Sequence, residues 1–349
     1  MNLLRKQARV RRLDLDGRVE MIHGGGGRAT AQLVADLFQH HLDDPLLCKG
    51  GDQAMLGHVP GRIVTSTDSH VVSPLFFRGG DVGSLSVHGT VNDIAMSGAV
   101  PLYLTAGFII EEGFPLRDLD RIAASMAAAA RRAGVRVVAG DTKVVQRGKG
   151  DGVFITTAGI GALADGVDLG PSRISAGDKI LVSGTIGDHG VAILSQRENL
   201  EFDGDIASDS APLGDLVQAM LAAAPQLHCL RDPTRGGLAA VLNELAQESG
   251  HAMHIREAAL PVSATVAGAC ELIGLDPLHI ANEGKLVAFC PAEVAAPLLA
   301  AMRAHELGRN ASIIGEVVEQ AATPVEMTTV LGGRRVVDWI NGEQLPRIC

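Results

Sequence analysis

The chain is poor in aromatic side chains and in basic charge. Of its 349 residues only 3% are aromatic, and 30 Lys and Arg stand against 40 Asp and Glu, which gives a formal net charge of −10. Few aromatic rings leave little surface for stacking on bases, and the acidic balance repels phosphate backbones and anionic membrane surfaces. We therefore expect neither nucleic acid nor membrane as a partner, and small molecules and proteins instead.

Paired cysteines and long apolar runs are also missing. The cysteines are odd in number and lack any Cys-x-x-Cys spacing, so they predict neither a disulfide framework nor a zinc site. The charged start, Met1 to Glu20, does not resemble a signal peptide, and no apolar stretch reaches the roughly 18 residues of a membrane-spanning helix. We expect a protein of the reducing cytoplasm, in which Cys48, Cys229, Cys270 and Cys290 are core residues or bystanders.

Small and aliphatic residues are abundant in this chain. Hydrophobic residues make up 46% of the chain and there are 42 glycines, which suits tightly packed α/β layers in two domains. The polar, Gly-rich and Pro-containing stretch Asp165 to Gly177 separates them. We predict the following division: an N-terminal extension with a Gly-rich segment (1–41), a first α/β domain (42–165), a second α+β domain (166–322) and a tail (323–349).

Hydrophobic periodicity places the secondary structure of both domains. Strands are predicted at Arg62 to Thr67, Leu102 to Ile110, Arg136 to Ala139, Val153 to Gly161, Lys179 to Ser183, Lys285 to Cys290 and Ser312 to Val318. Helices are predicted at Thr30 to His41, Gly83 to Met96, Leu116 to Ala133, Gly214 to Ala224, Gly236 to Glu248, Ala264 to Ile273 and Glu293 to His305. A short hairpin is expected to turn at Gly332-Gly333.

Several aspartates stand near the ends of these elements. Asp68 and Asp141 follow predicted strands, Asp93 follows Asn92 inside a helical segment, and Asp52 lies in the loop before the first strand. One such aspartate alone is more often a helix cap or a turn residue. Clustered carboxylates repel each other unless a cation neutralises them, so convergence of these groups would imply Mg²⁺.

Two glycine-rich turns are suited to phosphate. Gly184 to Gly190 opens a helix after an apolar strand, where free amides and the helix dipole attract anions, and Asp232 to Gly237 has the same character. Neither spacing matches a P-loop or a dinucleotide fingerprint, and either could be a plain capped turn. Lys143 and Glu283 are isolated ionisable residues beside similar turns, and a solvated charge is the default explanation for both.

The last side chain is a thiol. Cys349 follows Pro346, which lacks an amide donor and favours an extended chain before it, so we expect the terminal segment to project rather than pack. Such a thiol could enter an active site on its own subunit and then be presented to another protein. The alternative is an exposed terminal cysteine without a role.

Taken together, the motifs resemble the hydrogenase maturation HypE family. They are Thr67-Asp68-Ser69, Asn92 to Ala99, Gly140-Asp141-Thr142-Lys143, Asp232 to Gly237, Asn282-Glu283-Gly284-Lys285 and Pro346-Arg347-Ile348-Cys349. The Asp and Gly motifs indicate the wider superfamily of aminoimidazole ribonucleotide synthetase and thiamine-monophosphate kinase. The terminal tetrapeptide narrows the resemblance to the HypE family within that superfamily. The resemblance runs from about His23 to the end and gives the first twenty residues no role.

The resemblance implies a PurM-like homodimer whose N-terminal domains join their sheets and bind ATP with Mg²⁺. A HypF-type carbamoyltransferase would place a carboxamide on Cys349, and this chain would dehydrate it to a thiocyanate. The cyano group would then pass to iron held by HypC and HypD, as a ligand of [NiFe] hydrogenase. The tail would be mobile, with an inward and an outward state.

By the same resemblance, Asp52, Asp68, Asp93 and Asp141 would hold metal and phosphates, together with Gly140, and with Asn92 and Asp232 as weaker candidates. Glu283 would take protons from the amide nitrogen, and Lys143 would steady the amide oxygen or the transferred phosphoryl group. Which of these two takes which role stays open. These assignments agree with the chemistry, because an amide oxygen leaves only after it is phosphorylated and the nitrogen must lose its protons.

Two other functions compete with this one. A PurM-like ATP-dependent kinase or synthetase acting on a free small molecule would make Cys349 irrelevant. A non-enzymatic carrier with a terminal thiol would need neither the Asp motifs nor the Gly motifs. The terminal tetrapeptide favours the dehydratase.

Overall fold

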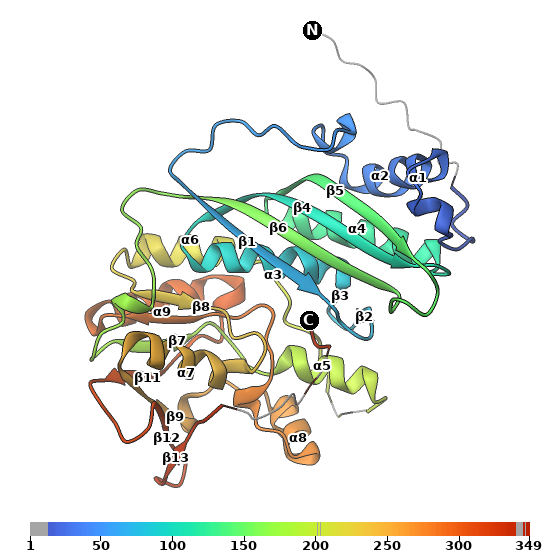
Figure 1. The fold of residues 1–349 in the computed structure, drawn as a ribbon. Coiled ribbons are helices and arrows are strands. Elements are labelled where there is room, and N and C mark those ends of the chain that lie inside the picture. The colour runs from blue at the N-terminus through green and yellow to red at the C-terminus, as the bar shows by residue number, and fades with distance from the viewer. Residues whose placement is uncertain (1–12, 201, 203, 340–344, 346) are drawn as a thin grey trace.

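The computed structural model describes residues 13–200, 202, 204–339, 345 and 347–349. Its first sheet joins four strands in the order β1 (Arg62–His70), β6 (Val153–Leu163), β4 (Val100–Glu111) and β5 (Arg136–Val145). β4 and β5 run parallel, and the other pairs are antiparallel. Helices α3 (Val82–Met96) and α4 (Leu116–Arg132) cover one face of this sheet (Figure 1).

The two covering helices differ in how much of their surface is buried. α4 buries one stripe, at Leu119, Ile122, Ala123 and Met126, with the spacing of an amphipathic helix. α3 is buried nearly all round, because it packs on the sheet, on α4 and on the second domain. Asp81 caps its N-terminus by accepting from two backbone amides. α3 therefore stands between the domains and can position side chains there.

The opposite face of the first sheet is open over much of its area. Ile63, Val100 and Ile109 are 66%, 44% and 44% exposed on it. Side chains that pair across neighbouring strands share a face, so Thr105, Gly107 and Ile109 of β4 share this face with their partners on β5. An open apolar sheet face on this scale is typical of an interaction surface.

A helical segment covers the β5 edge on the closed side. It consists of α1 (Arg28–Leu33), a π-helical turn (Val34–Phe38) and α2 (Gln39–Leu42), and it buries Leu33, Leu37 and Phe38 in the first core. The helix predicted for Thr30 to His41 is thus present. However, it belongs to the first domain and is not a separate extension, because its apolar side chains have no other core in which to be buried.

The second sheet has the order β13 (Arg334–Val336), β12 (Val325–Thr328), β9 (Ala252–Arg256), β11 (Ser312–Val318), β7 (Lys179–Val182), β10 (Val287–Cys290) and β8 (Cys229–Arg231). α7 (Gly237–Ser249) covers one face, and α6 (Gly214–Ala223) with α9 (Ala295–Ala304) covers the other. Side chains of β7 alternate accordingly: Ile180 and Val182 lie in the α7 core and Leu181 lies in the α6 and α9 core.

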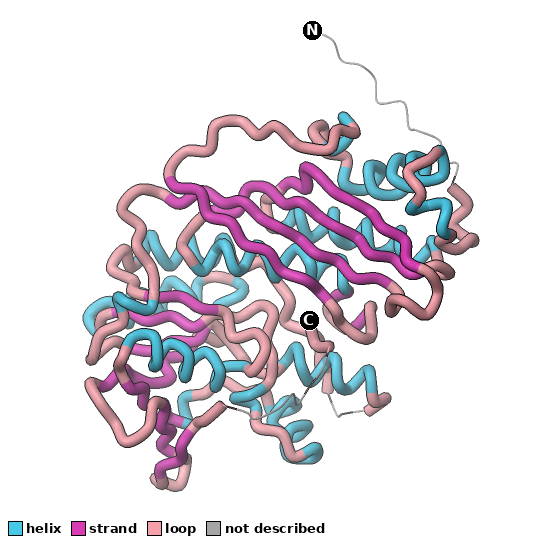
Figure 2. Tube along the Cα trace, in the orientation of Figure 1, coloured by secondary structure: helices cyan, strands magenta, loops and turns pink. Residues whose placement is uncertain are grey.

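Two further helices, α5 (Asp188–Arg197) and α8 (Ala264–Ile273), contact each other beside the second sheet, and the short strands β2 (Phe76–Phe77) and β3 (Gly80–Asp81) precede α3. The C-terminus lies between α5 and the end of β1 (Figures 1 and 2). Among the helices that the structure describes, none is long and apolar enough to cross a membrane.

The predicted elements are present, with differences at their ends. β1 and β5 extend well beyond the predicted Thr67 and Ala139, so Asp68 and Asp141 lie within strands and do not follow them. The predicted hairpin is present as β12 and β13, but β12 pairs with β9. The predicted tail boundary at residue 323 is therefore wrong, because residues 325–336 complete the second sheet.

Candidate active site

Acidic side chains from both domains meet beside the C-terminus. Asp68 comes from β1 and Asp93 from α3, while Asp232 and Glu283 come from loops of the second domain. The charges of Asp68 and Asp93 act on both Asp232 and Glu283, and the charge of Asp68 also acts on Asp93. Of the four aspartates for which convergence was predicted, only Asp68 and Asp93 lie in this cluster, and the fold adds Asp232 and Glu283 by placing α3 against the second domain.

Asp68 and Asp93 are held by hydroxyl and imidazole groups of the same strand. Ser66 Oγ donates to Asp93 Oδ2 at 2.7 Å, and His70 Nε2 lies 3.3 Å from Asp68 Oδ2. Gly89 of α3 permits this approach, because a Cβ there would lie 2.7 Å from His70 Nε2 and 3.0 Å from Asp68 Oδ2. A larger residue at position 89 would push the strand and helix apart.

The pKa values of the cluster are spread by burial and by mutual repulsion. Burial, followed by the charge of Asp68, raises the pKa of Asp93. Burial, followed by the charges of Asp93 and Asp68, raises the pKa of Asp232 to about 7. Burial opposes the shift at Asp68, but the neighbouring His70 lowers the pKa of that carboxyl overall. The site therefore carries negative charge that a cation would stabilise.

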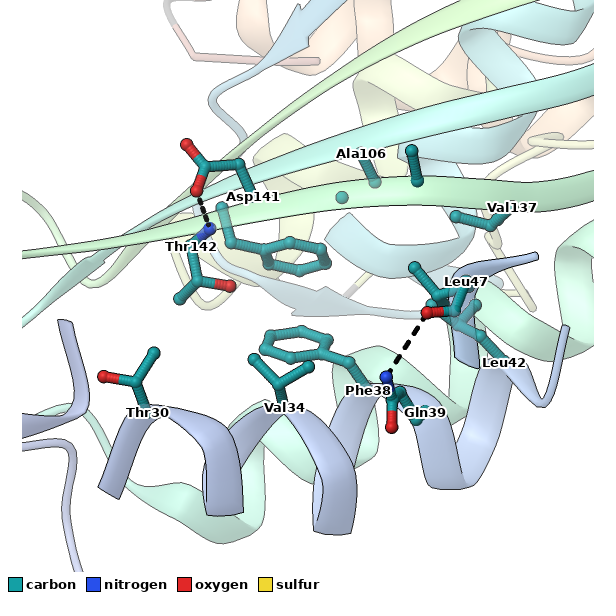
Figure 3. Close-up of a pocket in the computed structure, with 13 residues that line it drawn as sticks. Thr30, Val34, Phe38, Gln39, Leu42, Leu47, Ala106, Val137, Asp141 and Thr142 are labelled. Atoms are coloured by element: carbon teal, nitrogen blue, oxygen red, sulfur yellow. Dashed lines mark hydrogen bonds between the residues drawn. The ribbon is translucent and has the colours of Figure 1, made fainter. Parts of the chain in front are cut away.

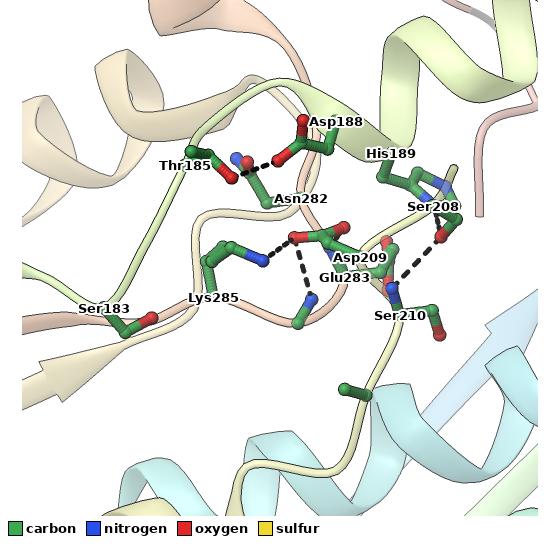
Figure 4. A network of polar contacts seen from close by, with 12 residues as sticks. Ser183, Thr185, Asp188, His189, Ser208, Asp209, Ser210, Asn282, Glu283 and Lys285 are labelled. Atoms are coloured by element: carbon green, nitrogen blue, oxygen red, sulfur yellow. Dashed lines mark hydrogen bonds and ion pairs between the residues drawn. The ribbon is translucent and has the colours of Figure 1, made fainter. Parts of the chain in front are cut away.

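Glu283 is positioned by a buried network (Figure 4). Asp209 accepts from the backbone amides of Glu283 at 3.0 Å and Gly284 at 3.3 Å, and it pairs with Lys285 Nζ at 2.9 Å. A Cβ on Gly284 would lie 1.9 Å from the Asp209 carbonyl oxygen, which explains the glycine. The backbone of this turn is thereby fixed from two sides.

Asn92 has a positioning role in this structure. Its side-chain amide donates to the carbonyl oxygens of Ala211 and Glu283 and accepts from the backbone amide of Leu213. The amide is 2% exposed and bridges α3 to the loops of the second domain. Asn92 thus helps to hold Glu283, whereas the sequence indicated it as a weak nucleotide ligand.

Glu283 faces the terminal thiol. Its side chain is 5% exposed, and its Oε1 has no hydrogen-bond partner within the part of the chain that is described. Burial, followed by the charges of Asp209 and Asp232, raises the pKa of Glu283 well above its usual range. Burial, followed by the charge of Glu283, also raises the pKa of the Cys349 thiol, which therefore stays protonated at neutral pH. The Glu283 carboxyl holds its proton more tightly than an exposed carboxyl does.

The terminal segment packs against the protein, so the expectation that it projects is wrong for this conformation. Val71 donates to the carbonyl oxygen of Cys349 at 3.0 Å, Ser73 donates to that of Arg347 at 3.1 Å, and Ile348 is 3% exposed. The backbone pairing and the apolar side chain outweigh the tendency of a terminus to stay extended. An outward state of the tail stays a prediction.

Asp141 and Lys143 lie away from this cluster. Asp68, Thr157, Ala106 and Gly140 form one row across the first sheet, so Asp141, the next residue, points to the opposite, open face. β1 and β5 are the two edges, about 14 Å apart at about 4.8 Å per strand. Lys143 Nζ pairs with Asp141 Oδ2 at 2.7 Å. This ion pair lowers the pKa of the Asp141 carboxyl, although partial burial acts in the opposite direction.

Gly140 and Asp141 line the rim of a small apolar pocket of about 140 Å³ (Figure 3). Phe38 and Phe108 contact each other inside it in a tilted arrangement, with ring centroids 4.6 Å apart, and Val34 and Thr142 complete the wall. The pocket lies between β5 and the α1–α2 segment. Asp52 is exposed in the loop that leaves this helical segment for β1, outside the acidic cluster.

The acidic cluster suits magnesium by its donor type but does not form a complete cage. Asp68 and Asp93 supply carboxylate oxygens, and Glu283 has an unpartnered buried oxygen nearby. Across the described ranges, no group of three or more His, Cys, Asp or Glu side chains has the geometry to hold a metal ion. This combination fits Mg²⁺ that arrives with a nucleotide, since such ions use one or two carboxylates and take the remaining ligands from phosphates and water.

Sequence reasoning missed several members of the site. Asp209 stands in no motif, and only its burial beside Lys285 reveals it. Arg235 belongs to a motif that was noticed, but its closeness to Cys349 and Asp68 depends on the packing of the two domains. His70 follows Asp68 by two residues. Side chains two apart on a strand lie on the same face, so this spacing could have identified His70 as a neighbour of Asp68.

Comparison with known proteins agrees with this architecture. Residues 50–163 match the AIR synthase related protein N-terminal domain, and residues 175–327 match the corresponding C-terminal domain. The carbamoyl dehydratase HypE of Azotobacter vinelandii is 62% identical over 339 residues, which cover 97% of this chain and 99% of that protein.

Solved structures agree as well. A crystal structure of hydrogenase maturation protein HypE in complex with ATP superposes with a TM-score of 0.91 at 48% identity and covers 95% of this chain and 99% of that one. A HypE–HypF complex gives a TM-score of 0.78 at 48% identity, with 90% of this chain and all of that chain covered. The chain therefore belongs to the HypE family of carbamoyl dehydratases, within the AIR synthase related proteins.

Proposed function

We propose that this chain uses ATP to dehydrate an S-carboxamide on its own Cys349 to a thiocyanate, which supplies cyanide for the iron of [NiFe] hydrogenase. The observation that carries the proposal is that the half-buried Cys349 thiol lies beside the buried Glu283 carboxyl, whose charge acts on it, inside an acidic cluster. A bystander thiol has no reason to be held against a buried acid.

The chemistry divides into two steps. The carboxamide oxygen attacks the γ-phosphorus of ATP while the nitrogen gives up one proton, which yields an S-bound imidate phosphate and ADP. The C–O bond then breaks as the nitrogen loses its second proton, which releases phosphate and leaves S–C≡N. Phosphorylation is needed because an amide oxygen is a poor leaving group.

Glu283 is the base in this scheme. Its position beside Sγ of Cys349 places it near a nitrogen bonded to the carbon on that sulfur, and its raised pKa makes its ionised form a stronger base. Asp68 and Asp93 would hold Mg²⁺, with Asp232 as a weaker candidate. Bound there, the ion supplies neutralisation of phosphate charge.

We further propose a homodimer in which the open faces of two first sheets pack together. Ile63, Val100 and Ile109 on that face support it. Asp141 and Lys143 also point to this face, so a second copy would bring them towards the other subunit's Cys349. Lys143 would there steady the amide oxygen or the transferred phosphoryl group.

The nucleotide base has a candidate site in the pocket of Phe38 and Phe108. Its apolar wall suits a purine, and its rim carries Gly140 and Asp141, which we propose contact the phosphates. Asp52, in the neighbouring loop, would join them as a metal ligand. The ATP complex of the related HypE supports nucleotide binding by this fold.

The proposal includes protein partners. The HypE–HypF complex supports a HypF-type carbamoyltransferase that places the carboxamide on Cys349. HypC and HypD would receive the cyano group for their iron, and we place the protein in the cytoplasm, where its thiols stay reduced. The raised pKa of Cys349 implies that the inward thiol is a poor nucleophile, so the tail must move outward to be carbamoylated.

The test is the intact mass of the full-length chain after incubation with its carbamoyltransferase and carbamoyl phosphate, before and after ATP and Mg²⁺ are added, with Cys349→Ala alongside. One carboxamide gained at Cys349, and one water then lost only with ATP, is the expected result. An adduct that persists while ATP is consumed would favour the kinase acting on a free small molecule. Absence of ATP turnover would favour the thiol carrier.

A further inference from the structure

Two polar side chains of α5 bond the backbone of the inward tail. His189 and Arg197 stand near the two ends of this helix. His189 Nε2 lies 2.8 Å from the Ile348 carbonyl oxygen, and Arg197 Nη2 donates to the Arg347 carbonyl oxygen at 2.8 Å. Neither residue belongs to the motifs that identify the family or to the acidic cluster.

The protonation of His189 follows from its surroundings. The ring is 0% exposed, and burial lowers its pKa, so it is neutral at pH 7. The Ile348 carbonyl oxygen can only accept, so the proton of the neutral ring sits on Nε2, and the Ser208 hydroxyl donates to His189 Nδ1 at 2.7 Å (Figure 4). Nδ1 is then the acceptor, and Nε2 carries the proton that is donated to Ile348.

Arg197 links the tail to the strand end that it pairs with. Its Nε and Nη2 donate to the Ser73 carbonyl oxygen at 2.9 and 2.7 Å, and Nη2 also reaches Arg347. Ser73 in turn donates its amide to Arg347. The guanidinium thus bonds both of the backbone segments that pair with each other, at Ser73 and at Arg347. The tail is held here as an added strand is held at the edge of a sheet.

α5 also makes apolar contacts with the tail. Ile193 of α5 lies in the same core cluster as Ile348, and a Cβ on Gly190 would lie 3.2 Å from Leu345 Cδ1. Ile348 is thus the apolar anchor, and the polar contacts are made to main-chain carbonyls. Such contacts do not depend on whether the sulfur carries a proton, a carboxamide or a cyano group.

We propose that His189 and Arg197 form a clasp that positions the tail for dehydration by holding the backbone of Arg347 and Ile348 inward. They are positioning residues that set the fraction of molecules with Sγ of Cys349 beside Glu283. The inference rests on the proposed dehydration at Cys349 for its catalytic consequence, but the clasp itself is measurable without it.

The first experiment measures the rate at which iodoacetamide modifies Cys349 in the full-length protein, by peptide mass spectrometry. We expect His189→Leu combined with Arg197→Met to raise this rate at least about fivefold, because the thiol leaves its buried position. The exposed Cys48 serves as internal reference. The matched control on α5 is Gln196→Ala, because the Gln196 amide donates to the Phe76 carbonyl oxygen and not to Arg347 or Ile348. His189→Gln keeps a donor and should stay near the unsubstituted rate.

An unchanged Cys349 rate in the double variant would overturn the clasp. Equal acceleration at the buried Cys229 and Cys290 would do so too, because it would assign the effect to general loosening of the fold.

The second experiment follows water loss from protein already carrying the carboxamide. We expect the double variant to lose water at least tenfold more slowly with an unchanged KM for ATP, while the partner carbamoylates it at the original rate or faster. Slower carbamoylation would contradict the clasp. If Cys349 becomes reactive in the variant while the unsubstituted protein never loses water, the clasp stands and the proposed function fails.

Discussion

The two edges of the first sheet carry similar residues in opposite settings. At the β1 edge, Asp68 faces α3 and joins buried acids of the second domain and the terminal thiol. At the β5 edge, Asp141 faces the open side, is 67% exposed and pairs with Lys143. The pKa of Asp93 beside the first edge is raised by burial, whereas that of Asp141 is lowered.

This difference shows how an aspartate on an edge strand acquires a different role at each edge of the sheet. The β1 edge has the sulfur, the base and the buried charge, so it is arranged for proton transfer and for a cation. The β5 edge has an exposed cation and an apolar pocket, so it is arranged for a nucleotide. Within one chain Asp141 and Lys143 lie on the open face, opposite Asp68, while the pocket lies on the closed side of the same edge. The open face is where a second copy could approach Asp141 and Lys143.

The largest effect is expected at the base. Glu283→Gln keeps the shape of the side chain but removes proton acceptance, and it should slow single-turnover water loss from the carboxamide by about 10²-fold or more while ATP still binds. Rapid quenching and intact mass measure this. Glu271→Gln on the exposed face of α8 is the control, and a loss of less than about threefold at Glu283 would remove it from the base role.

The pocket at the other edge should affect ATP binding. Val34→Trp fills the space beside Phe38 and should weaken ATP binding about tenfold, because the base loses its apolar wall. Calorimetric titration with ATP and Mg²⁺ measures this, with Val330→Trp on the exposed hairpin as the control. Equal affinity in both variants would place the base elsewhere.

Neutralising one acid at each edge should change stability differently. Asp93→Asn removes a charge whose pKa is raised by partial burial and by Asp68. Because the residue is still exposed to solvent, the substitution should increase the free energy of unfolding by only about 0.5 kcal/mol at pH 8 in the absence of ligands. Asp141→Asn removes an exposed ion pair and should change it by about 0.5 kcal/mol or less. Chemical denaturation measures both. A larger loss at Asp141 than gain at Asp93 would reverse the comparison.

A further effect on stability concerns pH. The pKa of Asp232 is about 7 when folded and near 3.8 when unfolded, so its contribution to stability is present below about pH 4 and is lost as the pH rises through 7. Asp232→Asn should flatten this part of the stability curve by about 1 kcal/mol, allowing for partial exposure. Denaturation at a series of pH values measures it, with exposed Asp215→Asn as control. A curve as steep as the original would contradict the raised pKa.

The sequence predicted the elements well because hydrophobic periodicity reports which faces are buried. α4, β6 and β11 agree closely with their predictions. It could not place Asp141, because the extension of β5 past Ala139 depends on pairing with β4, and that pairing decides which face Asp141 occupies. It also missed the packed tail, since Val71, Ser73 and His189 are brought to Ile348 only by the tertiary fold.

The deletion of Ile348 and Cys349 illustrates the same limit. From the sequence, such a truncation should leave folding nearly intact. In the structure Ile348 is buried in the first core, so its removal should cost stability as well as activity. Cys349→Ala separates the two effects, because it keeps Ile348 and the backbone pairing and removes only the sulfur.

The central claim is that the two edges form one site between subunits. Its most direct test is to mix Lys143→Ala protein, which keeps its terminal thiol, with Cys349→Ala protein, which keeps its lysine, after unfolding and refolding them together. If Lys143 acts on the other subunit's Cys349, dehydration should return to about a quarter of the unsubstituted level, since half of the dimers are mixed and each has one complete site. Mixed dimers that form but stay inactive would contradict the claim and return Lys143 to its own subunit.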